Sequence, residues 1–319
     1  MRQLSKRKDT YTVDYPEAVA FAEKQTSIFW TAEEIAVHKD VQDILVNLTE
    51  AEKHGVITTL KLFTLYEQIV GEDYWERVGQ LFHHPADIKR MAVTNAFMEQ
   101  GVHGPFYNKI NAALGLSTDE FYSSYTADPA LRSRIEMLER HARSDNIPEF
   151  LIALSFAEGV VLYSSFAFLK HFQSNGKNKI SNIVRGINFS VRDGSLHCDC
   201  SSWLYKTFLD EEGIKPEAYK ELAETIAHTV REHEYAIVDK IFEKGRIEGI
   251  TDVQMKHFID SRINLVLRGL GYSNLYEVNY NPIASTFYDG INAYTYNDFF
   301  AGQGREYART WDESGFTWD

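Results

Sequence analysis

The sequence has few of the residues that interrupt helices or cross-link a chain. Its 319 residues include only 7 Pro, 19 Gly and 2 Cys. So few Pro and Gly exclude a disordered or collagen-like chain. The two cysteines, Cys198 and Cys200, are two residues apart, which suits neither a disulfide framework nor a zinc site with four ligands. We expect both to be free, buried thiols in a reducing cytosol.

Positive charge is also scarce. The chain has 33 Lys and Arg against 46 Asp and Glu, a formal net charge of -13. Nucleic acid and anionic membranes would repel such a surface, so we expect neither as a partner. The first eight residues lead into no apolar run, and no secretory signal is expected. The composition therefore favours a cytoplasmic protein.

One apolar run is long enough to imitate a membrane span. Residues 150–169 contain a single charged side chain, that of Glu158. A carboxylate near the centre of the run makes membrane insertion costly. We therefore expect a buried helix in a large bundle, with Glu158 facing a polar site.

Helical periodicity dominates the rest of the chain, without sustained β-alternation or a repeat of fixed period. Residues 1–28 are expected to form an extended arm that leads into a helix capped by Thr31, with Glu34 completing a capping box. The predicted helices cover residues 32–46, 49–72, 87–113, 118–143, 148–173, 178–209, 215–244 and 252–270. They predict an all-α bundle with long central helices over residues 29–280. Residues 281–319 are rich in aromatic side chains without helical period, and we expect a mobile C-terminal tail that orders on a partner.

Four of the predicted helices carry side chains of the kind that bind metal ions. The candidates are Glu67, Glu99 or Gln100 with His103, Glu158, and His197. In carboxylate-bridged metal bundles two helices give one carboxylate each and two give a Glu-x-x-His pair, whose members share a helix face. Several such groups buried without a cation would be very costly, so the set predicts a metal site. Tyr107 follows His103 by about one turn, a spacing at which a metal centre can oxidise a phenol.

Several motifs resemble the radical-generating small (beta) subunit of class I ribonucleotide reductase, which has a ferritin-like fold. The resemblance spans nearly the whole chain. It rests on residues 29–35 with Lys39 and Asp40, residues 96–99 with His103 and Tyr107, residues 157–159, residues 192–199, and the C-terminal pieces 281–282, 297–300, 306–307 and 316–319.

The resemblance implies an oxidoreductase subunit, the beta chain of an aerobic ribonucleoside-diphosphate reductase. It would work as a homodimer with a large (alpha) subunit, bound through the C-terminal tail, in making deoxyribonucleotides. An iron or manganese centre would generate a radical stored on Tyr107. Trp30, Asp193 and His103 would begin the route outward, and Tyr307 would pass the oxidation to the large subunit, which binds the ribonucleotide.

The chain departs from the family motif Arg-Asp-Glu-x-x-His, because Gly194 occupies the position of a metal-bridging carboxylate. Three outcomes are open for the cofactor. The centre is dinuclear, as the resemblance implies, and bridged by water or Glu158; or it holds a single metal; or it is empty.

The spacing of the earlier metal helix also differs, since three residues lie between Glu99 and His103 instead of two. Either Gln100 takes the ligand position, or a bulge accommodates one extra residue and keeps Glu99 in place. The bulge is favoured because Gly104 and Pro105 predispose this helix to distortion.

Two rival functions remain. One is a ferritin-like metal oxidase that acts on its own substrate, which would leave the tail without a purpose. The other is a non-catalytic, partner-binding subunit whose metal site has decayed. Gly194 favours the latter, whereas the presence of Trp30, Asp193, Tyr107 and Tyr307 speaks against it.

Overall fold

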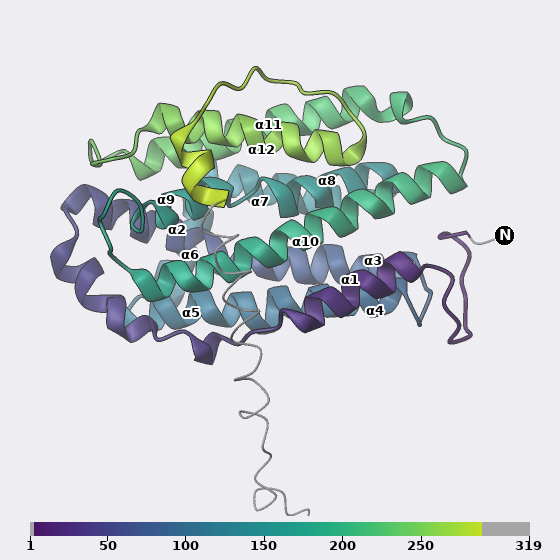
Figure 1. Cartoon of the computed structure of the whole chain (residues 1–319), viewed down its shortest axis with the longest axis horizontal. Coiled ribbons are helices and arrows are strands. Elements are labelled where there is room, and N and C mark those ends of the chain that lie inside the picture. The colour runs from purple at the N-terminus through teal and green to yellow at the C-terminus, as the bar shows by residue number, and fades with distance from the viewer. Residues whose placement is uncertain (1–2, 289–319) are drawn as a thin grey trace, which may run out of the picture.

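Helices make up nearly all regular structure in residues 3–288, the part of the chain that the computed structural model describes (Figure 1). The α-helices are α1 Pro16–Ser27, α2 Glu50–Ile69, α3 Arg77–Leu81, α4 Ile88–Phe97, α5 Gly104–Ala113, α6 Asp119–Ala127, α7 Pro129–Ala142, α8 Ile147–Gly159, α9 Tyr163–His171, α10 Ser181–Glu211, α11 Lys220–Ile241 and α12 Asp252–Leu270. Short 3-10 segments are η1 Ala32–Glu34, η2 Val37–Asp40 and η6 Pro216–Tyr219, and π segments are η3 Asp43–Asn47, η4 Val70–Glu76 and η5 Met98–His103. Residues 3–288 contain no strand, only one isolated bridge, so the all-α prediction is confirmed.

Helix α8 lies at the centre of the bundle and packs along α10, with α11 and α12 as a layer on one side and α1, α4 and α5 on the other (Figure 1). Every residue of α8 from Phe150 to Gly159 is buried. The stretch Ile147–His171 is long and apolar enough to cross a membrane, yet its most apolar window of 18 residues is entirely buried inside the protein. The prediction of a buried central helix is therefore confirmed.

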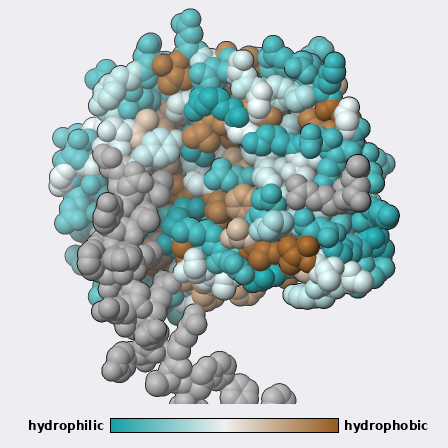
Figure 2. All heavy atoms as spheres, turned by 45° about the vertical axis from the view of Figure 1, so that its right-hand side comes forward, coloured by the Kyte–Doolittle hydropathy of each residue, from teal (hydrophilic) through white to brown (hydrophobic). Residues whose placement is uncertain are grey.

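The outer surface contrasts with this apolar interior. Figure 2 shows hydrophilic side chains over most of one face, with apolar residues in separate groups between them. Val93 and Phe97 on α4 are among the large apolar side chains that remain more than half exposed, at 55% and 53%. The long helices thus direct one face to the core and the other to water.

Two predicted helices are each divided in the structure. The predicted helix 118–143 breaks at Asp128, because Pro129 begins α7 and the Asp128 carboxylate accepts a hydrogen bond from the Ala130 backbone at 3.0 Å. The predicted helix 148–173 breaks between α8 and α9, where Leu162 adopts a left-handed conformation with φ of 75°. The second break lies directly after Glu158.

The N-terminal region differs from the predicted extended arm. Pro16 begins helix α1, which buries the small side chains of Ala18 and Ala22 as it packs against α4 and α10. The capping interaction at Thr31 does form, since Glu34 accepts from the Thr31 backbone N–H at 3.0 Å. It caps a single 3-10 turn, because η1 ends at Glu34, and residues 32–46 are three short helical segments instead of one helix.

The folded domain also continues past residue 280, where the sequence predicted the start of a mobile tail. Residues 282–288 are helical, and Ile283 and Phe287 are buried. The Lys170 ammonium donates to the Phe287 carbonyl at 2.8 Å, and the Phe287 ring packs against Phe258 of α12. The boundary at 281 is therefore too early by at least eight residues. Tyr307 and the rest of the predicted tail lie outside the described residues.

Candidate metal centre

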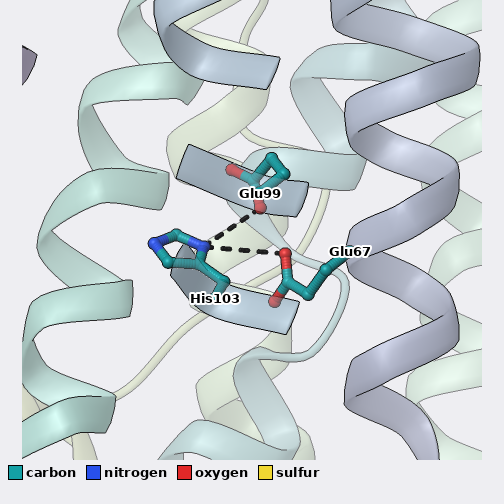
Figure 3. A group of neighbouring side chains, drawn as sticks. All are labelled: Glu67, Glu99 and His103. Carbon is teal, nitrogen blue, oxygen red and sulfur yellow. Dashed lines mark hydrogen bonds and ion pairs between the residues drawn. The ribbon is translucent and has the colours of Figure 1, made fainter. Parts of the chain in front are cut away.

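Five acidic and imidazole side chains from four parts of the bundle meet in its interior: Glu67 of α2, Glu99 and His103 of η5, Glu158 of α8 and His197 of α10. All five are buried. They form a first group, Glu67, Glu99 and His103 (Figure 3), and a second group, Glu99, Glu158 and His197. Within each group, one ligand atom per residue lies within 4.8 Å of the others. The two groups share Glu99.

The π turn η5 brings Glu99 and His103 to one face. The backbone N–H of Gly104 donates to the carbonyl of Glu99, five residues earlier. A π turn has more residues per turn than an α-helix, so side chains four residues apart face the same way. Glu99 Oε2 consequently lies 3.0 Å from His103 Nδ1. Of the two sequence-based alternatives, the bulge is the one that forms.

The same turn moves Gln100 away from the interior. The Gln100 side chain is exposed, and its amide donates to Glu76 Oε1 at 2.9 Å. The prediction of Gln100 as a candidate ligand is therefore wrong. The extra residue of the π turn rotates Gln100 to the surface and leaves Glu99 in the inward position.

The first group holds unequal carboxylates. Glu67 Oε2 lies 3.6 Å from His103 Nδ1, as the dashed lines in Figure 3 indicate. Burial, followed by the neighbouring Glu99, raises the pKa of Glu67 well above its usual range. Burial also acts to raise the pKa of Glu99, but the charge of His103 and the close polar contacts with Glu67, His103 and His197 together outweigh burial and hold that pKa well below the usual value. The proton is therefore more favoured on Glu67 than on Glu99.

The second group centres on His197. Its Nδ1 lies 2.6 Å from Glu99 Oε1 and 3.4 Å from Glu158 Oε1. The indole N–H of Trp75 donates to Glu158 Oε1 and orients that carboxylate. Trp75 comes from the π segment η4, directly after α2. Sequence reasoning missed Trp75, because α-helical spacing gives no reason to place it near Glu158.

Gly194 lies beside the second group. It precedes His197 by three residues on α10, so both belong to the same helix face. A Cβ at position 194 would lie 3.9 Å from Glu158 Oε2 and 3.5 Å from the Glu158 carbonyl, which are ordinary contacts. A larger side chain would therefore point at Glu158. The second group has two carboxylates, one of them shared with the first.

A chain of hydrogen bonds leads away from the first group. The indole N–H of Trp30 donates to Asp193 Oδ2 at 2.7 Å, and the same oxygen lies 3.0 Å from His103 Nε2. All three side chains are buried. Asp193 therefore fixes the orientation of His103, as an outer carboxylate does for a metal-binding histidine. The predicted set Trp30, Asp193 and His103 is brought together in the structure.

Tyr107 is enclosed by aromatic rings on the side of the first group. Its ring stacks on Phe63 at 4.3 Å and contacts Phe106 at 5.0 Å between centroids. The hydroxyl is buried and makes no aligned hydrogen bond to another described residue. Burial raises the pKa of Tyr107 well above its usual range, Glu67 adds to the shift and Ser190 offsets part of it. The phenol is therefore protonated and shielded from water.

The residues present fit divalent metal ions. No Lys or Arg in residues 3–288 forms an ion pair with Glu67, Glu99 or Glu158, although all three are buried. His197 Nδ1 approaches Glu99 Oε1 and Glu158 Oε1 without the alignment of a hydrogen bond, and neither ring nitrogen of His197 makes a hydrogen bond to a residue in the range 3–288. Atoms aimed at a common point in this way suit a shared cation, and carboxylates with imidazoles suit iron or manganese.

Comparisons with known proteins find relatives along most of the chain. Among curated relatives, the probable ribonucleoside-diphosphate reductase small subunit 048L of Invertebrate iridescent virus 3 is 26% identical over 318 residues, covering 93% of this chain and 83% of that protein. The ribonucleoside-diphosphate reductase 2 subunit beta of Escherichia coli (strain K12) is 24% identical over 290 residues, covering 88% and 87%.

Solved structures share the fold. The dimanganese(II)-NrdF of Streptococcus sanguinis superposes with a TM-score of 0.76 at 22% identity, covering 88% of this chain and 99% of that one. A putative class I ribonucleotide reductase from Bacillus halodurans gives 0.75 at 24% identity, covering 85% and 100%. The predicted ferritin-like bundle is thereby confirmed. The family model described as "Ribonucleotide reductase, small chain" matches residues 7–282. The chain therefore belongs to the small-chain family of ribonucleotide reductase and is a subunit of an oxidoreductase.

Proposed function

We propose that this small chain generates a radical on Tyr107, stores it there and passes the oxidation to a large subunit that reduces ribonucleotides to deoxyribonucleotides. The observation that carries the proposal is the placement of Tyr107 beside the first group, from which His103, Asp193 and Trp30 form a continuous hydrogen-bonded series. The curated relatives are named as ribonucleoside-diphosphate reductases, which supports diphosphates as the substrates.

The proposed cofactor is a pair of iron or manganese ions. Glu67, Glu99 and His103 would hold one ion, and Glu99, Glu158 and His197 the other. When bound and oxidised by oxygen, the metal ions would supply the oxidising power that removes an electron from a phenol. Two buried groups that share one carboxylate support a dinuclear centre. The structural neighbour from Streptococcus sanguinis is a dimanganese(II) protein, which supports manganese as one of the candidates.

The surrounding side chains would protect and connect the radical. Phe63 and Phe106 keep water from the Tyr107 ring, so the oxidised form has no nearby small molecule to react with. Because burial disfavours the tyrosinate anion, the phenol would lose its proton together with its electron. Asp193 would hold His103 and Trp30 in fixed orientation, which the transfer of an electron between them requires.

The proposed partners follow from the small-chain family. A large subunit would bind the C-terminal tail, with Tyr307 carrying the oxidation across the interface, and two copies of this chain would form a homodimer. We place the protein in the cytoplasm, where its substrates are made. The buried position of the apolar stretch Ile147–His171 supports this assignment.

The test is to load the protein anaerobically with iron or manganese, expose it to oxygen and count ions and unpaired electrons per chain. We expect about two ions, an electron paramagnetic resonance signal from a tyrosyl radical, and deoxyribonucleotide formation once the cognate large subunit is added. A fully loaded chain that forms no radical and supports no turnover would instead indicate a decayed, non-catalytic subunit.

A further inference from the structure

The hydroxyl of Tyr163 faces the space that the glycine at position 194 leaves open. Tyr163 is the first residue of α9 and is buried. Its hydroxyl oxygen lies 3.7 Å from the place where a Cβ at position 194 would sit, and Glu158 Oε2 lies 3.9 Å from the same place. An oxygen from Tyr163 and one from Glu158 thus flank the volume that a glutamate side chain would occupy.

The Tyr163 hydroxyl has little else to bind. Its one hydrogen-bond partner among the described residues is the Ser195 hydroxyl, at a long 3.4 Å. Ser195 already donates to the Val191 carbonyl at 2.8 Å, within its own helix. The oxygen of Tyr163 is therefore free to bind a further group without the loss of a strong hydrogen bond.

A buried positive charge lies against the same ring. The Arg262 guanidinium is 3.9 Å from the Tyr163 ring centroid. The guanidinium donates to the Gly159 carbonyl at 2.8 and 3.0 Å and to the Tyr288 hydroxyl at 3.0 Å. Gly159 is the last residue of α8, so the break between α8 and α9 leaves its carbonyl available to Arg262. No carboxylate within residues 3–288 forms an ion pair with Arg262, although it is buried. Burial raises the pKa of Tyr163 to about 12, and the charge of Arg262 offsets part of that rise.

The charge of the site points the same way. Glu67, Glu99 and Glu158 bring three negative charges to a centre where two divalent ions would bring four positive ones, before Arg262 is counted. Two adjacent cations repel each other strongly in a protein interior. A fourth anionic oxygen beside the second group would reduce that repulsion.

We propose that Tyr163, as its phenolate, is the oxygen ligand that replaces the missing carboxylate at Gly194, on the metal ion held by Glu99, Glu158 and His197. On binding, the O–H bond of the phenol breaks, a metal–oxygen bond forms and the proton passes to solvent. No electron is transferred in this step. The inference rests on the proposed function, because it requires a metal ion in the second group.

Iron(III) makes this ligand visible, because a phenolate bound to iron(III) gives a charge-transfer absorption in visible light and resonance-enhanced phenolate vibrations. The full chain is loaded with iron, oxidised, and examined by both spectroscopies with the iron content measured separately. We expect the phenolate signal in the wild-type protein and in Tyr107→Phe, and its complete loss in Tyr163→Phe. A wild-type protein with two irons and no phenolate signal would overturn the proposal for Tyr163 and leave the proposed function standing. A phenolate signal that survives in Tyr163→Phe would have the same meaning.

A second variant keeps the test independent of any folding defect in Tyr163→Phe. Gly194→Glu restores the carboxylate in a space where its Cβ makes only ordinary contacts. We expect Gly194→Glu to bind two irons but to lose the phenolate signal, since the carboxylate displaces the phenol. An unchanged signal in Gly194→Glu would contradict the proposal. A wild-type chain that binds no iron would overturn this inference and the proposed function together.

Discussion

The two metal-binding groups share Glu99 but differ in how completely they are built. In the first group, both ring nitrogens of His103 face carboxylates, with Glu99 and Asp193 each 3.0 Å away. In the second group, neither ring nitrogen of His197 makes an aligned hydrogen bond, and Gly194 removes a side chain beside Glu158. The first group is thus fixed by the protein, whereas the second depends more on the ion it would hold.

The surroundings of the two groups differ as well. Among the charged groups, Glu67 raises the pKa of Tyr107 the most, and the series to Trp30 starts at His103, so both elements of the proposed radical chemistry adjoin the first group. The loss at Gly194 falls on the other side of the centre. The comparison teaches that position 194 can lack a carboxylate while His103, Asp193 and Trp30, on the side of the first group, remain joined by hydrogen bonds.

The largest effect is expected from the residue that belongs to both groups. Glu99→Gln removes the shared negative charge, and we expect it to weaken both metal positions by more than about 100-fold, since changes to outer-shell partners alone reach that size. Elemental analysis after loading and desalting measures the loss. Gln100→Ala, one residue away and exposed, is the matched control and should keep the wild-type metal content. Normal metal binding by Glu99→Gln would show that Glu99 is not a ligand shared by the two groups.

The next largest effect separates metal binding from radical storage. Tyr107→Phe deletes only a hydroxyl that has no hydrogen-bond partner within residues 3–288, so we expect unchanged metal content and loss of the tyrosyl radical signal and of turnover with a large subunit. Tyr125→Phe is the control, because Tyr125 is also buried, its hydroxyl likewise lacks a hydrogen-bond partner among the described residues, and it belongs to neither metal group. A radical signal of wild-type intensity in Tyr107→Phe would place the radical on another residue.

Much of this arrangement is predictable from residue types and their spacing. The helical periods and the apolar run around Glu158 predict a bundle with a polar centre, and residues 3–288 have that architecture. The breaks are harder to predict, since the left-handed Leu162 that separates α8 from α9 follows from no local signal. Helix propensities favour continuation there, and the tertiary contacts of the Gly159 carbonyl with Arg262 override them.

The candidate site shows the same division. A spacing of four residues between Glu99 and His103 fits an α-helix or a π turn, and the two differ by a small free energy that local sequence does not decide. Tertiary contacts favour the π turn, because it places Glu99 against His103 and His197 in the interior and Gln100 at the surface. Sequence analysis missed Trp75 because this residue reaches Glu158 from a second π segment. The direction of a side chain in a π segment differs from the direction that α-helical periodicity predicts.

A smaller, one-sided effect is expected when each group loses its own carboxylate. Glu67→Gln should remove one ion and abolish the radical, since it dismantles the first group beside Tyr107. Glu158→Gln should remove the other ion and leave Glu67, Glu99 and His103 able to bind one. Metal titrations of both variants, each compared with wild type, measure the two affinities separately. Equal loss of both ions in both variants would mean that the groups bind cooperatively as one unit.

The smallest effect concerns the two tryptophans, which make similar hydrogen bonds on opposite sides of the centre. Trp75→Phe removes the donor to Glu158, so we expect the metal affinity of the second group to fall by about tenfold. Trp30→Phe removes the donor to Asp193, which is outside both metal groups, so we expect nearly normal metal affinity but loss of turnover with a large subunit. Because both changes shrink a buried ring, thermal unfolding of the two variants serves as the control for stability. Trp30→Phe could instead weaken metal binding as much as Trp75→Phe does. In that case the hydrogen bond from Trp30 to Asp193 would support the metal ions as the one from Trp75 to Glu158 does, and the two sides of the centre would not differ in this respect.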